Sequence, residues 1–213
     1  MFGRIHQLQP LHPSKPFSFR RRLKEIDMFF NRRDPVHQTM YRLARRLEKV
    51  QLPYAIVGAM ALNAHRYRRT TDAVDVLTTR QGFAEFRERF LGKDYDPVPG
   101  RRKRFVERKS QVSVDVLITG LFPCSGKPGP LAYPKPEDVS EKIDNVSVVD
   151  LATLTQLKLA ARRYKDFGDV VALIRVHSLD EDFADRLHRS VRGDYVECLE
   201  EKRREDEYEA REG

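Results

Sequence analysis

The chain has 213 residues, which suits one domain with a small annex and excludes a large multidomain protein. It is 40% hydrophobic and 34% charged, and no uncharged run approaches the roughly 18 residues of a membrane span, which excludes an integral membrane protein. Residues 1–22 lack the apolar stretch of a secretory signal, and the two cysteines provide neither a disulfide framework nor a four-thiolate zinc site. We therefore expect a cytoplasmic protein with no membrane partner.

The formal net charge of +8 lies in residues 1–50, which hold 12 Lys or Arg and 4 Asp or Glu. There the basic residues, which include the consecutive Arg20, Arg21 and Arg22, are interleaved with phenylalanines, a pattern that suits contact with the phosphates and bases of RNA. The alternative is a solvated tail whose phenylalanines dock on the domain. We expect residues 1–34 to form a basic, partly irregular arm. Residues 194–213, with 9 acidic and 4 basic side chains, predict an acidic surface helix.

The first ordered elements follow the arm. Apolar residues recur at three- and four-residue spacing over residues 36–50, which predicts a helix that ends before Pro53. Residues 54–57 form a short apolar run typical of a buried strand. Gly58 marks a turn from this strand directly into a helix over residues 58–65. Such a turn leaves backbone amides free to meet a phosphate.

The rest of the chain alternates strands and helices. A segment rich in Gly and Pro, residues 119–136, predicts a long loop between them. We expect strands at residues 73–77 and 111–118, and helices at residues 83–91, at residues 150–161 with Asp150 as N-cap, and at residues 169–176.

Two carboxylates stand in the middle of predicted strands. Asp75 and Asp115 are each flanked by Val, and an unpaired carboxylate in an internal strand is costly unless it meets a cation or donors. Because Mg²⁺ prefers carboxylate oxygens together with substrate phosphates, the two strands predict a cation site. The alternative for each is a solvent-facing or edge position.

Other candidate motifs are weaker. His65 is expected to end a helix, since no second His stands four residues away and no Cys is near. The run Ser125-Gly126-Lys127 lacks the spacing of a phosphate-binding loop. The basic run of residues 101–104 is expected on a hairpin or loop near the third predicted strand, where it either meets an acceptor nucleic acid or is solvated.

In combination, these features resemble the minimal nucleotidyltransferases of the DNA polymerase beta-like superfamily, especially the AbiEii-type toxin relatives. The match includes Tyr54 to Leu77, with its glycine turn and an Arg-x-Thr before the strand, and the run from Lys158 to Asp169. It covers roughly residues 40–178. The resemblance implies an α+β fold, an α/β mixed sheet with a C-terminal helical part. We expect a core at residues 35–135, a helical part at 136–193 that completes the active-site cleft, and the acidic tail.

The resemblance also implies a reaction. A nucleoside monophosphate would pass from an NTP, such as ATP, to an acceptor hydroxyl, with pyrophosphate leaving and Mg²⁺ or Mn²⁺ bound in the site. Gly58 and Ala59 would contact the triphosphate, supported by Arg69 and Thr70. Lys158 would contact phosphate or the base edge, oriented by Asp166 or Asp169. From the residues alone, Lys158 could equally be a solvated helix face and Asp169 an N-cap. The metal ligands would be position 73, Asp75 and Asp115.

The sequence departs from the family pattern at two positions. The first Asp of the expected pair falls on Ala73, and the usual Gly after His falls on Arg66. Ala73 removes a metal ligand, and Asp72 does not replace it because adjacent strand residues point to opposite faces. We therefore expect a silenced site. Either an engineered Asp-to-Ala substitution, which the retained site residues favour, or a natural pseudoenzyme accounts for it.

The leading hypothesis is thus a metal-dependent, toxin-like nucleotidyltransferase in an inactivated form. A tRNA acceptor is favoured because the basic arm and three arginines of the basic run, Arg101, Arg102 and Arg104, provide an electrostatic grip on phosphates. An antitoxin protein partner is implied by the resemblance alone. The main alternative is a catalytically dead module of the same fold that binds a nucleotide or a partner protein. A third hypothesis is an RNA-binding protein that acts only through its arm.

Overall fold

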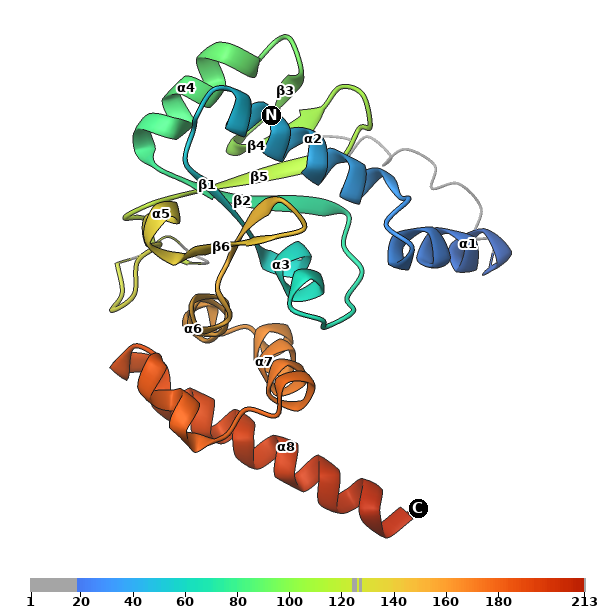
Figure 1. The fold of residues 1–213 in the computed structure, drawn as a ribbon, viewed down its shortest axis with the longest axis vertical. Coiled ribbons are helices and arrows are strands. Elements are labelled where there is room, and N and C mark those ends of the chain that lie inside the picture. The colour runs from blue at the N-terminus through green and yellow to red at the C-terminus, as the bar shows by residue number, and fades with distance from the viewer. Residues whose placement is uncertain (1–18, 124–125, 127, 213) are drawn as a thin grey trace, which may run out of the picture.

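The computed structural model describes the backbone of residues 19–123, 126 and 128–212, and the side chains of these residues from Lys24 onward. It has a mixed sheet, helices packed on the sheet, and a C-terminal helical part (Figure 1). The strands are β1 (Tyr54–Val57), β2 (Ala73–Thr78), β3 (Tyr95–Val98), β4 (Arg101–Glu107), β5 (Ser113–Ile118), β6 (Ser140–Ile143) and β7 (Val146–Val149). The helices are α1 (Phe19–Phe30), α2 (Pro35–Lys49), α3 (Gly58–Ala64), α4 (Arg80–Phe90), α5 (Pro136–Val139), α6 (Leu151–Ala161), α7 (Tyr164–His177) and α8 (Arg192–Glu212), with short 3₁₀ turns at Glu181–Arg186 and Arg189–Val191.

Within the described residues the strands form one seven-stranded sheet in the order β3-β4-β5-β2-β1-β7-β6. β1 runs antiparallel to β2 and parallel to β7, while β2 and β5 are parallel neighbours. β2 and β5 are therefore internal strands, as the sequence predicts. The mixed α/β sheet with a C-terminal helical part is confirmed.

Helix α2 illustrates how local sequence sets the elements. Asp34 caps it by accepting hydrogen bonds from the amides of Val36 and His37, and Pro35 occupies its first position. Its apolar stripe, which includes Leu43 and Leu47, is buried against the sheet. Asp150 caps α6 in the same way, as predicted.

The helices form layers around the sheet. In Figure 1, α2 and α4 lie above the central strands, whereas α6, α7 and α8 lie successively below them. A main apolar core joins the sheet to α2, α3 and α4. A second cluster joins α6 and α7 to α8 through residues that include Leu159, Ile174, Tyr195 and Cys198. The acidic segment 194–213 is thus largely part of a helix with a buried face, since its first two turns contribute Tyr195 and Leu199 to this cluster.

Several elements differ from expectation. Residues 140–149, expected in a helical segment, form β6 and β7, which extend the sheet beside β1. Helix α7 begins at Tyr164 rather than near residue 169. The run at residues 101–104 begins β4 of a hairpin with β3, which agrees with the expected hairpin or loop. The predicted helices and strands at 36–50, 54–57, 58–65, 73–77, 83–91, 111–118 and 150–161 are confirmed within a few residues.

The arm is partly described. Its residues 1–18, and the side chains of Arg20, Arg21 and Arg22, lie outside the described part of the chain. Phe29 in α1 is 5% exposed and packs on His37 with ring centroids 4.8 Å apart, so this phenylalanine docks on the domain. No described helix combines the length and apolar character needed to cross a bilayer.

Candidate functional site

The two strand carboxylates lie side by side. Asp75 on β2 pairs in register with Asp115 on β5, and on its other side with Val57, the last residue of β1. Asp115 pairs in turn with Arg104 on β4. Because cross-strand partners project from the same face of a sheet, one row places both carboxylates between the glycine turn and a guanidinium.

Gly58 makes room for this row. Its φ of +63° suits glycine, and a β-carbon there would lie 2.8 Å from Asp75 Cγ and closer still to Oδ2. The sequence expectation was a glycine that presents amides to phosphate. The structure adds a second reason for glycine, which is space for the Asp75 carboxylate.

Asp75 has an unusual electrostatic environment. Burial and the neighbouring charge of Asp115 raise the pKa of Asp75 to about 6, although Lys158 and Arg163 act in the opposite direction. No hydrogen bond or ion pair joins Asp75 to another described residue. A positively charged ligand near this carboxylate would relieve its repulsion with Asp115.

Asp115 is bound by Arg104. The guanidinium donates from Nε to Oδ1 at 2.7 Å and from Nη2 to Oδ2 at 2.6 Å, so both carboxylate oxygens are engaged. Contact of Arg104 with RNA stays a prediction. The structure places Arg104 in the carboxylate row, because the register of β4 against β5 sets it opposite Asp115. Arg101 and Arg102, earlier on β4, are exposed.

Lys158 on α6 is buried, with 8% exposure, which excludes a solvated position. Its Nζ lies 2.6 Å from Asp169 Oδ2 and 3.2 Å from Asp166 Oδ1, so both predicted partners contact it. Asp169 lies inside α7 and is not its N-cap.

Two arginines complete this buried network. Arg69 pairs with Asp169, and Arg163 donates to Asp166 at 2.5 Å and 3.0 Å. Burial alone would raise the pKa of Asp166, but Arg163 and Lys158 lower it below its ordinary value. The network joins the segment before β2 to helices α6 and α7, so it fixes the position of the Lys158 ammonium.

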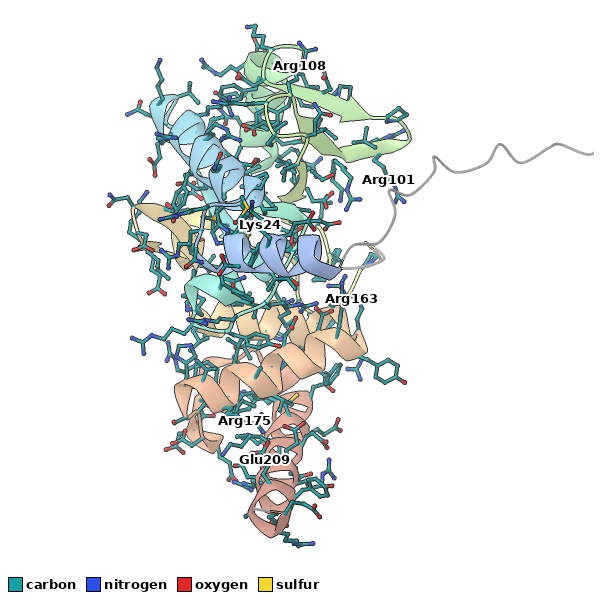
Figure 2. All side chains as sticks on the ribbon, turned by 90° about the vertical axis from the view of Figure 1, so that its right-hand side faces the viewer. Lys24, Arg101, Arg108, Arg163, Arg175 and Glu209 are labelled. Carbon is teal, nitrogen blue, oxygen red and sulfur yellow. The ribbon has the colours of Figure 1, made fainter. Side chains whose placement is uncertain are left out.

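A pocket of about 280 Å³ lies between the carboxylate row and α6. This volume is at the lower end of the roughly 300–1,000 Å³ typical of ligand pockets. Its polar and glycine lining is Gly58, Asp75, Lys103, Asp115, Tyr133, Lys158, Arg163 and Asp166, and its apolar lining includes Leu117, Leu154 and Leu157. We call it the Asp75–Asp115 pocket. In Figure 2, Arg101 on the β3–β4 hairpin and Arg163 at the start of α7 lie toward the same edge of the molecule.

Some predicted site residues lie outside this lining. Ala59, Arg69, Thr70, Ala73, Arg104 and Asp169 do not line the pocket. Asp169 contacts the pocket residue Lys158, and Arg69 is linked to it through Asp169. Sequence reasoning gave no role in the pocket to Lys103 and Tyr133. Lys103 belongs to the basic run of residues 101–104, which could have indicated it. Tyr133 lies in the predicted loop of residues 119–136, and no sequence pattern there indicates a site residue.

The implied two-ion centre does not fit the residues present. Ala73 lies two residues before Asp75 on the same strand face and provides no ligand. Both oxygens of Asp115 are held by Arg104. Among the described residues no group of three or more His, Cys, Asp or Glu is arranged to hold a metal ion.

Comparisons with known proteins give structural similarities. No family model matches the chain, and no curated protein matches its sequence. An antigenic nucleotidyltransferase-like protein from Paracoccidioides brasiliensis aligns with a TM-score of 0.43 and 14% identity, over 76% of this chain and 91% of that one. JHP933 from Helicobacter pylori aligns with a TM-score of 0.41 and 13% identity, over 70% of each chain. At TM-scores below 0.5 these similarities carry no functional argument.

Proposed function

We propose that this chain is a nucleotidyltransferase-fold protein that binds a nucleoside triphosphate in the Asp75–Asp115 pocket and transfers nucleotide poorly because position 73 is Ala. The observation that carries the proposal is the register of Asp75 with Asp115 beside the Gly58 turn, with Lys158 lining the same pocket. The glycine turn, the two strand carboxylates and the helical lysine, which the resemblance names in separate segments of the sequence, thus meet at one pocket.

The pocket has the chemistry for a nucleotide. Lys103, Lys158 and Arg163 provide cationic donors, which suit phosphate oxygens. Tyr133, Leu154 and Leu157 provide a wall against which a flat base could pack. A triphosphate with its base uses both kinds of surface.

Position 73 explains why transfer would fail. Its register partner on β5 is Ser113, so neither strand places a third carboxylate in that row. An Asp at position 73 would add a carboxylate on the same face as Asp75. We expect Mg²⁺ or Mn²⁺ to bind that variant, where a divalent ion would neutralise charge on the reacting phosphates.

The test compares the parent chain with two variants, Ala73→Asp and Ala73→Asn. The Asn side chain has nearly the same shape as the Asp side chain but carries no charge. Each is incubated with the four labelled NTPs, Mg²⁺ or Mn²⁺, and total tRNA, and products are separated on denaturing gels. We expect ATP or another NTP to bind the parent by calorimetry, and labelled product from Ala73→Asp alone.

The outcomes separate the hypotheses. If none of the three chains binds an NTP, the proposed function is wrong. If all bind and none labels RNA or co-purifying protein, the chain is a nucleotide-binding module without transfer activity. Labelling by Ala73→Asn equal to that by Ala73→Asp would show that the missing carboxylate is not the cause.

For the acceptor we propose tRNA, on the strength of the exposed Arg101 and Arg102 on the same hairpin strand as the pocket residue Lys103. The double variant Arg101→Glu/Arg102→Glu in the Ala73→Asp background should label tRNA more weakly and with a shallower salt dependence. Incorporation into protein and none into tRNA would overturn this acceptor. A toxin role with an antitoxin partner stays a prediction of the resemblance.

A further inference from the structure

Arg104 binds the Asp115 carboxylate at the position where an external cation would otherwise bind. We propose that Arg104, which binds the pocket residue Asp115 from outside the pocket lining, is the resident cation beside the Asp75–Asp115 pocket, so that this chain binds a nucleoside triphosphate without a divalent metal ion. The inference rests on the proposed function and adds to it the ionic requirement of binding.

The first support is the bidentate geometry. Arg104 uses Nε and Nη2 for the two oxygens of Asp115, and Nη1 makes no hydrogen bond to a described residue. A guanidinium has five donors in a planar fork that matches both carboxylate and phosphate. Arg104 can therefore neutralise Asp115 and still offer the two protons of Nη1 to a phosphate oxygen.

The second support is the charge balance of the pocket. Asp166 is neutralised by Lys158 and Arg163, and Asp115 by Arg104. Asp75 is the remaining carboxylate, and Lys103 is a further cation in the lining. Without Arg104, two adjacent carboxylates would face the phosphates and repel them.

The third support is that the ion pair can rearrange. The Arg104 side chain is 44% exposed and that of Asp115 is 26% exposed, so solvent screens the attraction between them. An arriving phosphate can therefore recruit the guanidinium without a large cost. A divalent ion would have to compete with Arg104 for both Asp115 oxygens.

The experiment measures ATP binding by isothermal titration calorimetry, in excess EDTA and in MgCl₂. We expect the dissociation constant of the parent chain in EDTA to lie within about threefold of its value in MgCl₂. Arg104→Gln should weaken binding in EDTA by about tenfold or more, and MgCl₂ should restore much of the loss because the freed Asp115 can then bind the ion.

Arg108→Gln is the matched control. Arg108 directly follows β4 and makes a similar exposed bidentate pair, but its partner Asp96 does not line the pocket, whereas Asp115, the partner of Arg104, does. Its loss should leave ATP binding unchanged under both conditions. Arg104→Lys retains the charge without the fork and should bind in EDTA with intermediate affinity.

Two results would overturn the inference alone: ATP binding by the parent only when MgCl₂ is present, or unchanged binding in EDTA by Arg104→Gln. If the parent binds ATP under neither condition, the proposed function fails and the inference fails with it. Circular dichroism of each variant confirms that it is folded before binding is measured.

Discussion

The carboxylate of Asp75 occupies space beside Gly58 that a side chain at position 58 would fill. A β-carbon there would lie 2.8 Å from Asp75 Cγ, and the positive φ of this residue independently favours glycine. The turn after β1 and the middle of β2 are therefore in close steric contact, so a side chain added at position 58 would displace the Asp75 carboxylate. Both residues line the same pocket.

Gly58→Ala should destabilise the fold and weaken ATP binding. Gly100→Ala is the control, since its φ of +72° imposes similar backbone strain but nothing lies within 4 Å of the added methyl group. We expect the control to cost about 1 kcal/mol and Gly58→Ala to cost about 1–3 kcal/mol more, measured by urea unfolding. Equal costs for the two variants would contradict the steric role of Asp75.

The stability of the chain should depend on the ionisation of Asp75. Its pKa is raised from 3.8 to about 6, so the folded chain binds this proton more tightly than the unfolded chain. The resulting stabilisation is present below about pH 4 and is lost as the pH rises through about 6. Asp75→Asn should therefore increase the free energy of unfolding at pH 7.5 by roughly 1–2 kcal/mol, a figure reduced to account for solvent screening of the Asp75 charge. The increase should disappear near pH 4, where Asp75 is protonated in both states.

Urea unfolding at the two pH values measures this difference. Asp96→Asn is the control, because Arg108 lowers the pKa of that exposed carboxyl. It should give no stabilisation at pH 7.5. A loss of stability in Asp75→Asn at pH 7.5 would show that the charge of Asp75 is favourable in the folded chain.

Lys158→Met should destabilise the chain and abolish tight ATP binding. The substitution leaves Asp166 and Asp169 buried with one arginine each, so we expect a cost of about 2–4 kcal/mol. Lys142→Met, which removes an exposed pair with Glu48, should cost under about 1 kcal/mol and leave ATP binding intact. Denaturant titration and calorimetry measure both effects. An equal cost for the two variants would contradict the buried network.

Glu107 on β4 should be structural and unrelated to the pocket. It is fully buried and accepts hydrogen bonds from Arg42 at 2.8 Å and Arg46 at 2.7 Å. Burial alone would raise its pKa, but these arginines outweigh burial and lower the pKa of Glu107 to about 2. Its stabilisation is therefore present above about pH 4.5 and is lost as the pH falls toward 2.

Glu107→Gln tests this role. At pH 7 it should cost about 3–5 kcal/mol, and at pH 3.5 the cost should be smaller. ATP binding by the folded fraction should match that of the parent. A cost that stays the same at both pH values would show that the charge of Glu107 is not what stabilises the network.

The sequence by itself determined the elements with strong local patterns. The apolar spacing of α2 and the short apolar runs of β1, β2 and β5 are visible within single segments, because periodicity and capping are local properties. Asp34 and Asp150 show the same point, since each caps the helix that directly follows it. The exposed polar strand β6, with the sequence Ser-Glu-Lys-Ile, has no such pattern and was missed.

The tertiary structure decided how the site residues meet. The binding of Arg104 to Asp115 follows from the register of β4 against β5, and the burial of Lys158 follows from the packing of α7 against α6. Neither relationship has a local signature, because a register or a helix contact depends on atoms brought together from distant segments. The sequence therefore left solvated positions open for Arg104 and Lys158, whereas the fold placed Arg104 against Asp115 and Lys158 against Asp166 and Asp169, where pairing lowers the cost of burial.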